Sequence, residues 1–294
     1  MNAERIQIPY KIVDVNKGNI DGCGLLCFQS KKQTEGYKKK VEWIRRRFDE
    51  GLCIKLVSVD EGAKRGFRIR GFIEYIPGEY SWRGISADGY MVIHCIWVVG
   101  RAKGHGFGSK LLEQCLNDAR SMNGVAVVTG RTWLPRPELF VKGGFVKVDS
   151  LAPDVELYAK RLKENAPMPH FNEGSERKLL ECASGITVFA SNQCPYSDSA
   201  VKEMTDVAQR FGLPIRVVEL NDCKEAQRNV HPYGTFCVVV DGQIMAYRPI
   251  GARGLIKRLS EREKYRTLFE KPKEKQVSTP MLRAADRGRA VLPS

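Results

Sequence analysis

Glycine alternates with other residues in the turn Lys103-Gly104-His105-Gly106-Phe107-Gly108. An apolar run, 90–99, precedes this turn, and a run with leucines at helical spacing, 109–116, follows it, so the pattern predicts strand, turn and helix. Backbone N–H groups stay unpaired at a helix N-terminus, where the dipole also favours an anion. Glycine adds no Cβ that would keep a phosphate away. The turn therefore indicates a site for a phosphorylated ligand; the alternative is a tight connection without a ligand.

The same turn resembles the pyrophosphate loop of the GCN5-related N-acetyltransferases (GNAT), whose pattern is Arg/Gln-x-x-Gly-x-Gly/Ala followed by a helix. Two registers fit, one on Arg101, Gly104 and Gly106 and the other on Lys103, Gly106 and Gly108. We prefer the second, because the helix then opens with Ser109. Further along, the segment 138–145 (ELFVKGGF) resembles the Leu-Tyr-x-Lys-x-Gly-Phe ending of the family.

The resemblance covers about residues 1–163 and implies a mixed-sheet α/β acyl-CoA N-acyltransferase domain. It implies that acetyl-CoA is the acyl donor, that no metal is needed, and that a small-molecule or peptide amine attacks the thioester directly in a ternary complex. It also implies which residues hold the cofactor: the backbone around Lys103, Gly104, His105, Gly106, Phe107, Gly108 and Ser109 for the pyrophosphate, Ile96, Trp97 and Val98 for the pantetheine arm, and Phe140 beside it.

Catalytic residues are less well marked. Glu74 and His94 lie on predicted strands near the site and are candidate bases, since an amine must lose a proton. Instead of acting as a base, Glu74 could face solvent on its strand. His94 could be a core residue whose ring nitrogens are hydrogen-bonded. Phe140 stands where the family often has a tyrosine, and a phenyl ring cannot donate a proton. Glu79 and Tyr80 could line the acceptor pocket instead.

A second domain is expected after the proline-bearing stretch at 164–170. The order β-α-β-α-β-β-α over 185–265 resembles the thioredoxin fold, and Cys194-Pro195-Tyr196-Ser197 resembles a monothiol glutaredoxin turn. The combination resembles the YoaP-like acetyltransferases. Gly234 falls where that fold normally has a cis-proline, so the backbone there should differ. We therefore predict four segments: 1–163 (GNAT), 164–184 (linker), 185–265 (the smaller thioredoxin-like α/β domain) and 266–294 (charged tail).

Cys194 precedes a predicted helix, where the dipole lowers a thiol pKa. We therefore expect a reactive thiol with a thiol partner, and Cys182 or Cys223 could resolve an oxidised Cys194. The alternative is that the second domain serves docking or formation of a homodimer.

Composition limits the remaining possibilities. The 294 residues carry 48 Lys and Arg against 34 Asp and Glu, a net charge of +14. We find no nucleic-acid-binding motif, so the charge favours a polyanion such as coenzyme A or a solvated surface. Nine cysteines without a paired framework suit a reducing cytoplasm, and no apolar run predicts a signal peptide or membrane span. The primary hypothesis is an acetyltransferase; the alternative is an acyl-CoA-binding sensor or thiol-redox module without turnover.

Overall fold

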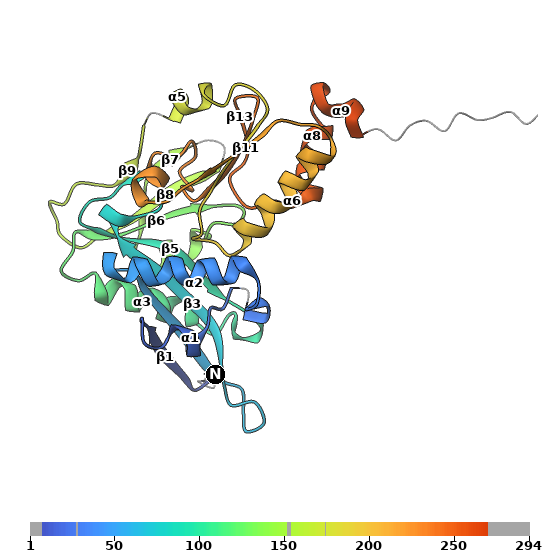
Figure 1. Ribbon diagram of the computed structural model, residues 1–294. Helices are drawn as coiled ribbons and strands as arrows, with labels where there is room; N and C mark the ends of the chain where they lie inside the picture. The colour runs from blue at the N-terminus through green and yellow to red at the C-terminus, as the bar shows by residue number, and fades with distance from the viewer. Residues whose placement is uncertain (1–7, 28, 152–153, 174, 270–294) are drawn as a thin grey trace, which may run out of the picture.

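The computed structural model describes residues 8–27, 29–151, 154–173 and 175–269. A seven-stranded sheet in the order β1-β2-β3-β5-β6-β8-β7 forms the N-terminal half (Figure 1). Its pairs are antiparallel except β5 with β6, which are parallel. The strands are β1 (Tyr10–Val15), β2 (Cys53–Asp60), β3 (Phe67–Pro77), β5 (Tyr90–Val98), β6 (Gly124–Gly130), β7 (Val146–Leu151) and β8 (Val155–Arg161).

The two faces of this sheet pack against different parts of the chain, as the alternating side chains of β3 show. Ile73 and Tyr75 pack in the core beneath α3 (Phe107–Asp118) and α4 (Glu138–Lys142). Phe72 and Ile76 pack with α2 (Glu35–Arg47) and with residues of the C-terminal half. Glu74 shares the second face because side chains alternate along a strand. The short helix α1 (Ile20–Cys23) precedes α2.

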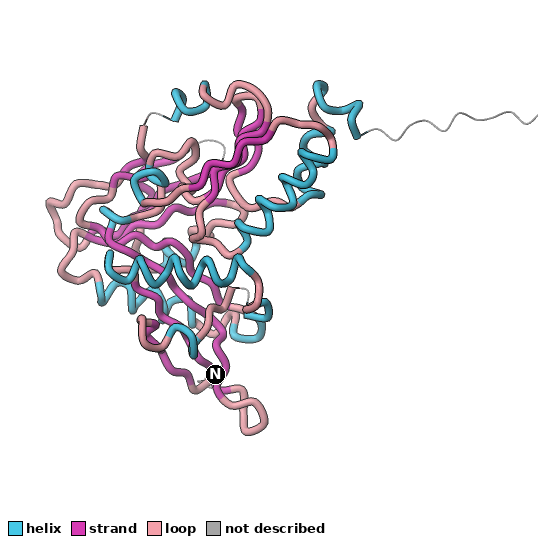
Figure 2. The backbone as a smooth tube through the Cα atoms, viewed as in Figure 1, coloured by secondary structure: helices cyan, strands magenta, loops and turns pink. Residues whose placement is uncertain are grey.

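The C-terminal half contains a four-stranded sheet, β11-β10-β12-β13 (Figure 2). Its strands are β10 (Ile186–Ala190), β11 (Ile215–Glu219), β12 (Phe236–Val240) and β13 (Gln243–Ala246). Its helices are α6 (Tyr196–Arg210), α7 (Cys223–Gln227), α8 (Ala252–Ser260) and α9 (Glu263–Phe269). The β-α-β-α-β-β-α order expected from the sequence is confirmed; the thioredoxin-like classification stays a prediction. No helix among the described residues has the length and apolar character needed to cross a membrane.

Several boundaries differ from those predicted. The range 164–184 contains β9 (His170–Phe171), which pairs with β4 (Ile85–Ser86), and α5 (Ser175–Leu180). Strand β7 was not predicted, although Val146 and Val148 alternate with polar residues. Helix α9 continues past residue 265 to Phe269, and the rest of the predicted tail, 270–294, lies outside the described residues.

The two halves share their hydrophobic cores. Tyr90 and Leu157 of the large sheet pack in one cluster with Val188 and Val238 of the small sheet. At Gly234 (φ +78°), an added Cβ would lie 2.1 Å from the Trp82 carbonyl oxygen, so only glycine permits this close approach. The sequence predicts that the backbone at Gly234 differs from that at the cis-proline of the thioredoxin fold. Whether 1–163 and 185–265 fold independently stays a prediction.

Candidate active site

Two adjoining hollows lie over β5. A groove of about 560 Å³ runs beside the glycine-rich turn, and a larger chamber of about 860 Å³ lies between the two halves. Both are lined by Ile96, Trp97, Lys103, Pro135 and Arg136, so a ligand in one can meet a ligand in the other.

The groove arises because β5 and β6 diverge. Their pairing runs from Tyr90–Gly124 to Ile93–Val127 and ends there, although β5 continues to Val98. In the pairing with β3, the register shifts so that Glu74 opposes Cys95 and Tyr75 opposes Ile93. His94 is therefore the extra residue of a bulge, a feature that re-aims backbone groups. The second part of β5 thus has backbone groups available on the β6 side.

The glycine-rich turn forms the other wall of the groove. Gly104 and Gly106 have φ near +80°, and no atom lies within 4 Å of the position of an added Cβ. Helix α3 begins at Phe107 rather than at Ser109, with Gly106 as its N-cap and no side chain capping it. The first-turn amides therefore remain available to an anion.

The structure brings together most of the residues predicted to hold the cofactor. Those lining the groove are Ile96, Trp97, Val98, Lys103, Gly104, Gly106, Phe107, Gly108 and Phe140. His105 and Ser109 belong to the turn and first helical turn but do not line the groove. Phe140 is fully buried and its ring packs on Phe145 at 5.5 Å, so its place offers no hydroxyl.

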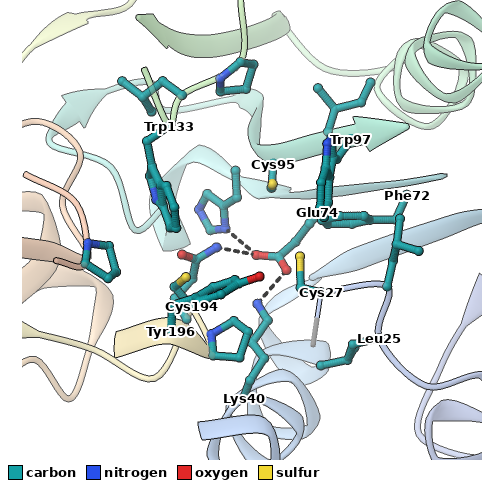
Figure 3. Close-up of a pocket in the computed structure, with 18 of the residues that line it drawn as sticks. Leu25, Cys27, Lys40, Phe72, Glu74, Cys95, Trp97, Trp133, Cys194 and Tyr196 are labelled. Atoms are coloured by element: carbon teal, nitrogen blue, oxygen red, sulfur yellow. Dashed lines mark hydrogen bonds and ion pairs between the residues drawn. The ribbon is translucent and has the colours of Figure 1, made fainter. Parts of the chain in front are cut away.

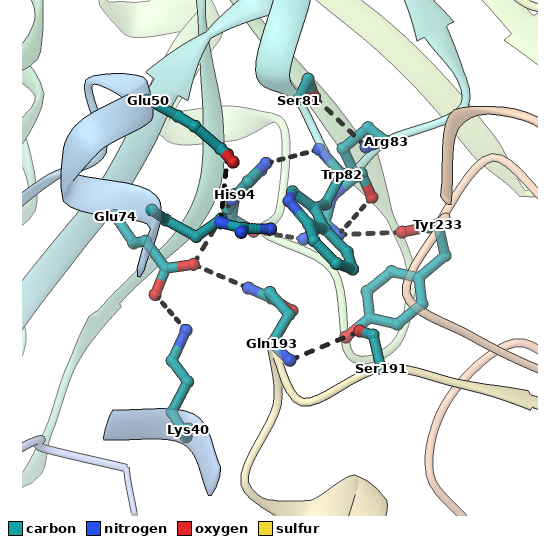
Figure 4. A network of polar contacts seen from close by, with 11 residues as sticks. Lys40, Glu50, Glu74, Ser81, Trp82, Arg83, His94, Ser191, Gln193 and Tyr233 are labelled. Carbon is teal, nitrogen blue, oxygen red and sulfur yellow. Dashed lines mark hydrogen bonds and ion pairs between the residues drawn. The ribbon is translucent and has the colours of Figure 1, made fainter. Parts of the chain in front are cut away.

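The floor of the chamber holds a polar network (Figure 4). Glu74 Oε2 accepts a 2.6 Å hydrogen bond from Lys40 Nζ on α2, and Oε1 accepts one of 2.8 Å from Gln193 Nε2. His94 Nε2 accepts the backbone N–H of Trp82 at 3.0 Å, so Nδ1 carries the proton, 3.4 Å from Glu74 Oε1. Glu74 is 2% exposed, which corrects the solvent-facing alternative.

Burial and charge set the protonation of this network. Burial alone would raise the pKa of Glu74, but Lys40 and His94 outweigh it and lower the pKa to about 2. Burial lowers the pKa of His94 to about 4 against the opposing contact with Glu74. At neutral pH, Glu74 is therefore ionised with both oxygens engaged, and His94 is neutral. Their assignment as bases stays a prediction.

Arg83 joins the β5 bulge to the C-terminal half. This buried side chain donates to the carbonyl oxygen of His94 at 2.6 Å and to that of Tyr233 at 2.8 Å. Its guanidinium also lies over the Tyr233 ring, 4.6 Å from the centroid. The bulge above the groove is thus held by a contact between the two halves.

Cys194 lies in the chamber wall, just before α6, as the sequence predicted (Figure 3). The expected lowering of its pKa is wrong: burial dominates over the backbone contact with Tyr196 and over the Lys40 charge and raises the pKa to about 11. Cys27 and Cys95 line the same chamber, whereas Cys182 and Cys223 do not. Glu79 and Tyr80, considered for the acceptor pocket, do not line it either.

Sequence reasoning missed Lys40, Arg83 and Gln193. Lys40 ends a run of three lysines at 38–40, yet its spacing from Tyr37 and Ile44 places it on the apolar face of α2. For Arg83 and Gln193 the sequence carries no comparable signal, because their partners are remote in the chain.

Comparisons with known proteins agree with this geometry. The model of the acetyltransferase (GNAT) family matches residues 25–132. The chain therefore carries an acetyltransferase domain of the GNAT family. It is 29% identical over 241 residues, 80% of this chain and 92% of the relative, to "Uncharacterized N-acetyltransferase YoaP" of Bacillus subtilis (strain 168).

Solved GNAT structures give weaker matches. An acetyltransferase from Staphylococcus aureus Mu50 is 14% identical, with a TM-score of 0.38, and the match covers 53% of this chain and 100% of that one. The N-acetyltransferase YhbS from Escherichia coli, solved in complex with CoA, is 12% identical with a TM-score of 0.38, over 58% of this chain and 94% of that one.

Proposed function

We propose that this acetyltransferase takes acetyl from acetyl-CoA bound in the groove and transfers it directly to an amine held in the chamber. The observation that carries the proposal is the end of β5–β6 pairing at Ile93–Val127, beside the uncapped N-terminus of α3. A strand with unpaired backbone groups and a helix N-terminus thus lie along one groove, which fits an extended chain that ends in a pyrophosphate.

The residues present suit coenzyme A. Amides around Gly104 to Gly108 would take the pyrophosphate, and open space at Gly104 and Gly106 permits its approach. Lys103 and Arg136, at the junction of groove and chamber, add positive charge. Ile96 and Val98 would pair with the pantetheine arm. The bound cofactor would supply an activated thioester, and the residues shared by the groove and the chamber would hold it near the acceptor.

Proton transfer depends on the chamber. The buried Phe140 cannot protonate the leaving thiolate, and Glu74 is a weak base because its pKa is about 2. We infer that the amine reacts in its neutral form, with its proton passing to water or to a neighbouring group. The positive charge of Arg83 at the chamber wall favours that neutral form.

The test is turnover with the full-length protein. Acetyl-CoA is incubated with a panel of amines and a lysine-containing peptide, and free thiol is measured together with the acetylated product. An acetyltransferase releases thiol and product in equal amounts with at least one acceptor. Binding of acetyl-CoA without thiol release across the panel would favour the acyl-CoA sensor. A thioredoxin-like fold, a thiol partner at Cys194, a homodimer and a cytoplasmic location stay predictions.

A further inference from the structure

We propose that the chamber binds a small monoamine with a flat, apolar ring, and that the C-terminal half supplies the wall that selects it. This inference rests on the acetyl transfer proposed above and concerns the acceptor. The chamber floor comes from β3 and β5, whereas much of the wall comes from residues 193–196, 199–200, Glu203, Tyr233 and 249–251. A volume of about 860 Å³ lies in the range of small-molecule pockets.

Trp133 marks the place of the ring. It is a bulky residue with φ +69°, a backbone conformation that costs free energy and persists where the surroundings hold it. Its indole Nε1 donates a 2.9 Å hydrogen bond to Tyr233 Oη of the C-terminal half. Nevertheless, 42% of Trp133 remains exposed, next to the chamber. A strained, anchored indole thus offers its remaining surface to a ligand.

Tyr196 completes an aromatic corner with Trp133. The two rings meet edge to face, with centroids 5.6 Å apart and planes at 79° (Figure 3). In Figure 3, Trp133 and Tyr196 lie on one side of the chamber, and Glu74 lies across from them. Aromatic rings prefer offset-stacked or edge-to-face neighbours, so two rings at nearly a right angle can contact a third ring by a face and an edge. Tyr196 belongs to the Cys-Pro-Tyr-Ser turn, which thereby serves acceptor binding.

The charges along the wall limit the ligand to one amine. The acidic residues that line the chamber in the described part of the chain are Glu74 and Glu203, and Glu74 is already paired with Lys40. Besides Lys40, which this pair neutralises, the basic residues that line it in the described part of the chain are Arg83, Lys103, Arg131 and Arg136. A second ammonium group would meet this excess of positive charge and would be repelled.

Three amines separate the effect of an aromatic ring in the acceptor from the effect of a second positive charge. Phenethylamine has a ring and one amine, butylamine has one amine without a ring, and cadaverine has two amines without a ring. With the full-length protein and acetyl-CoA, we expect kcat/KM for phenethylamine to exceed that for butylamine by roughly tenfold or more. Cadaverine should fall below butylamine. Equal values for all three, or faster acetylation of a lysine-containing peptide, would overturn the inference.

Two variants test whether the preference for phenethylamine comes from the aromatic corner of Trp133 and Tyr196. Trp133→Leu and Tyr196→Leu should each raise KM for phenethylamine by roughly tenfold and leave KM for butylamine within about twofold. Phe67→Leu is the matched control, since Phe67 is similarly exposed (41%) but lines neither hollow. Unchanged KM for phenethylamine in both corner variants would overturn the inference.

Calorimetry distinguishes failure of this inference from failure of the proposed function. Phenethylamine is titrated into wild type and into Tyr196→Leu, with and without CoA. If CoA binds but wild type and variant bind phenethylamine equally, the inference fails and acetyl-CoA binding stands. If CoA does not bind, the proposed function fails, and tighter phenethylamine binding by wild type would still support the aromatic corner.

Discussion

The carboxamide of Gln193 donates a 2.8 Å hydrogen bond to the carboxylate of Glu74, across 119 residues of sequence. Both side chains are buried. Gln193 belongs to the C-terminal half and Glu74 to the large sheet, so the second half completes the polar floor of the acceptor chamber. This contact gives the C-terminal half a part in the site that does not depend on thiol chemistry.

Removal of this contact should cost stability. In Gln193→Ala, Glu74 loses a partner while buried, and we expect the free energy of unfolding to fall by about 1–3 kcal/mol. Urea denaturation of the full-length protein measures it. The neighbouring Asn192→Ala is the control, since its 3.4 Å contact with Glu219 is exposed and should matter by less than about 0.5 kcal/mol. Equal losses in the two variants would contradict the role of Gln193.

The approach of the two halves at Gly234 can be tested against another glycine. Gly234→Ala places a Cβ against the Trp82 carbonyl oxygen, in addition to the strain of φ +78°. Gly212 has φ +63° with nothing within 4 Å, so Gly212→Ala carries the strain alone, about 1–2 kcal/mol. We expect Gly234→Ala to lower the thermal midpoint clearly further than Gly212→Ala. Equal shifts would show that the halves separate without cost at this point.

His94 should make stability depend on pH. Its pKa of about 4 in the folded state lies below its usual value of 6.5, so the unfolded chain binds more protons between these values. The free energy of unfolding should therefore fall as the pH drops from 7 to 4, by on the order of 1–2 kcal/mol from this residue by pH 5. In His94→Gln the unfolding free energy should depend less on pH across that window. A wild-type free energy that is constant from pH 7 to 4.5 would be inconsistent with a buried neutral His94.

Cys194 should be a slow thiol at neutral pH. Because burial raises its pKa to about 11, the thiolate is scarce at pH 7, and alkylation should accelerate until well above pH 9. Site-resolved mass spectrometry after iodoacetamide treatment, at a series of pH values, measures this profile. A plateau below pH 8 would restore the sequence-based prediction of a reactive thiolate.

These outcomes show where sequence reasoning succeeds and where it stops. The turn 103–108 and the order of elements over 185–265 could be predicted because glycine spacing and apolar periodicity are local signals. The pKa of Cys194 could not, since a local rule about helix N-termini is overruled by burial between the halves. Glu74 alternates with apolar neighbours along β3, yet its face is covered by α2 and the C-terminal half. Such contacts depend on tertiary packing, which periodicity does not encode.

The most direct test of the account is a calorimetric titration of coenzyme A into the full-length protein, its Gly106→Val variant and the control Gly212→Val. Both glycines have positive φ and open space around an added Cβ, so the two variants carry similar backbone strain. We predict that wild type and Gly212→Val bind coenzyme A alike and that folded Gly106→Val binds it roughly tenfold or more weakly. Unchanged affinity in folded Gly106→Val, or no binding by the wild type, would contradict the assignment of the cofactor groove.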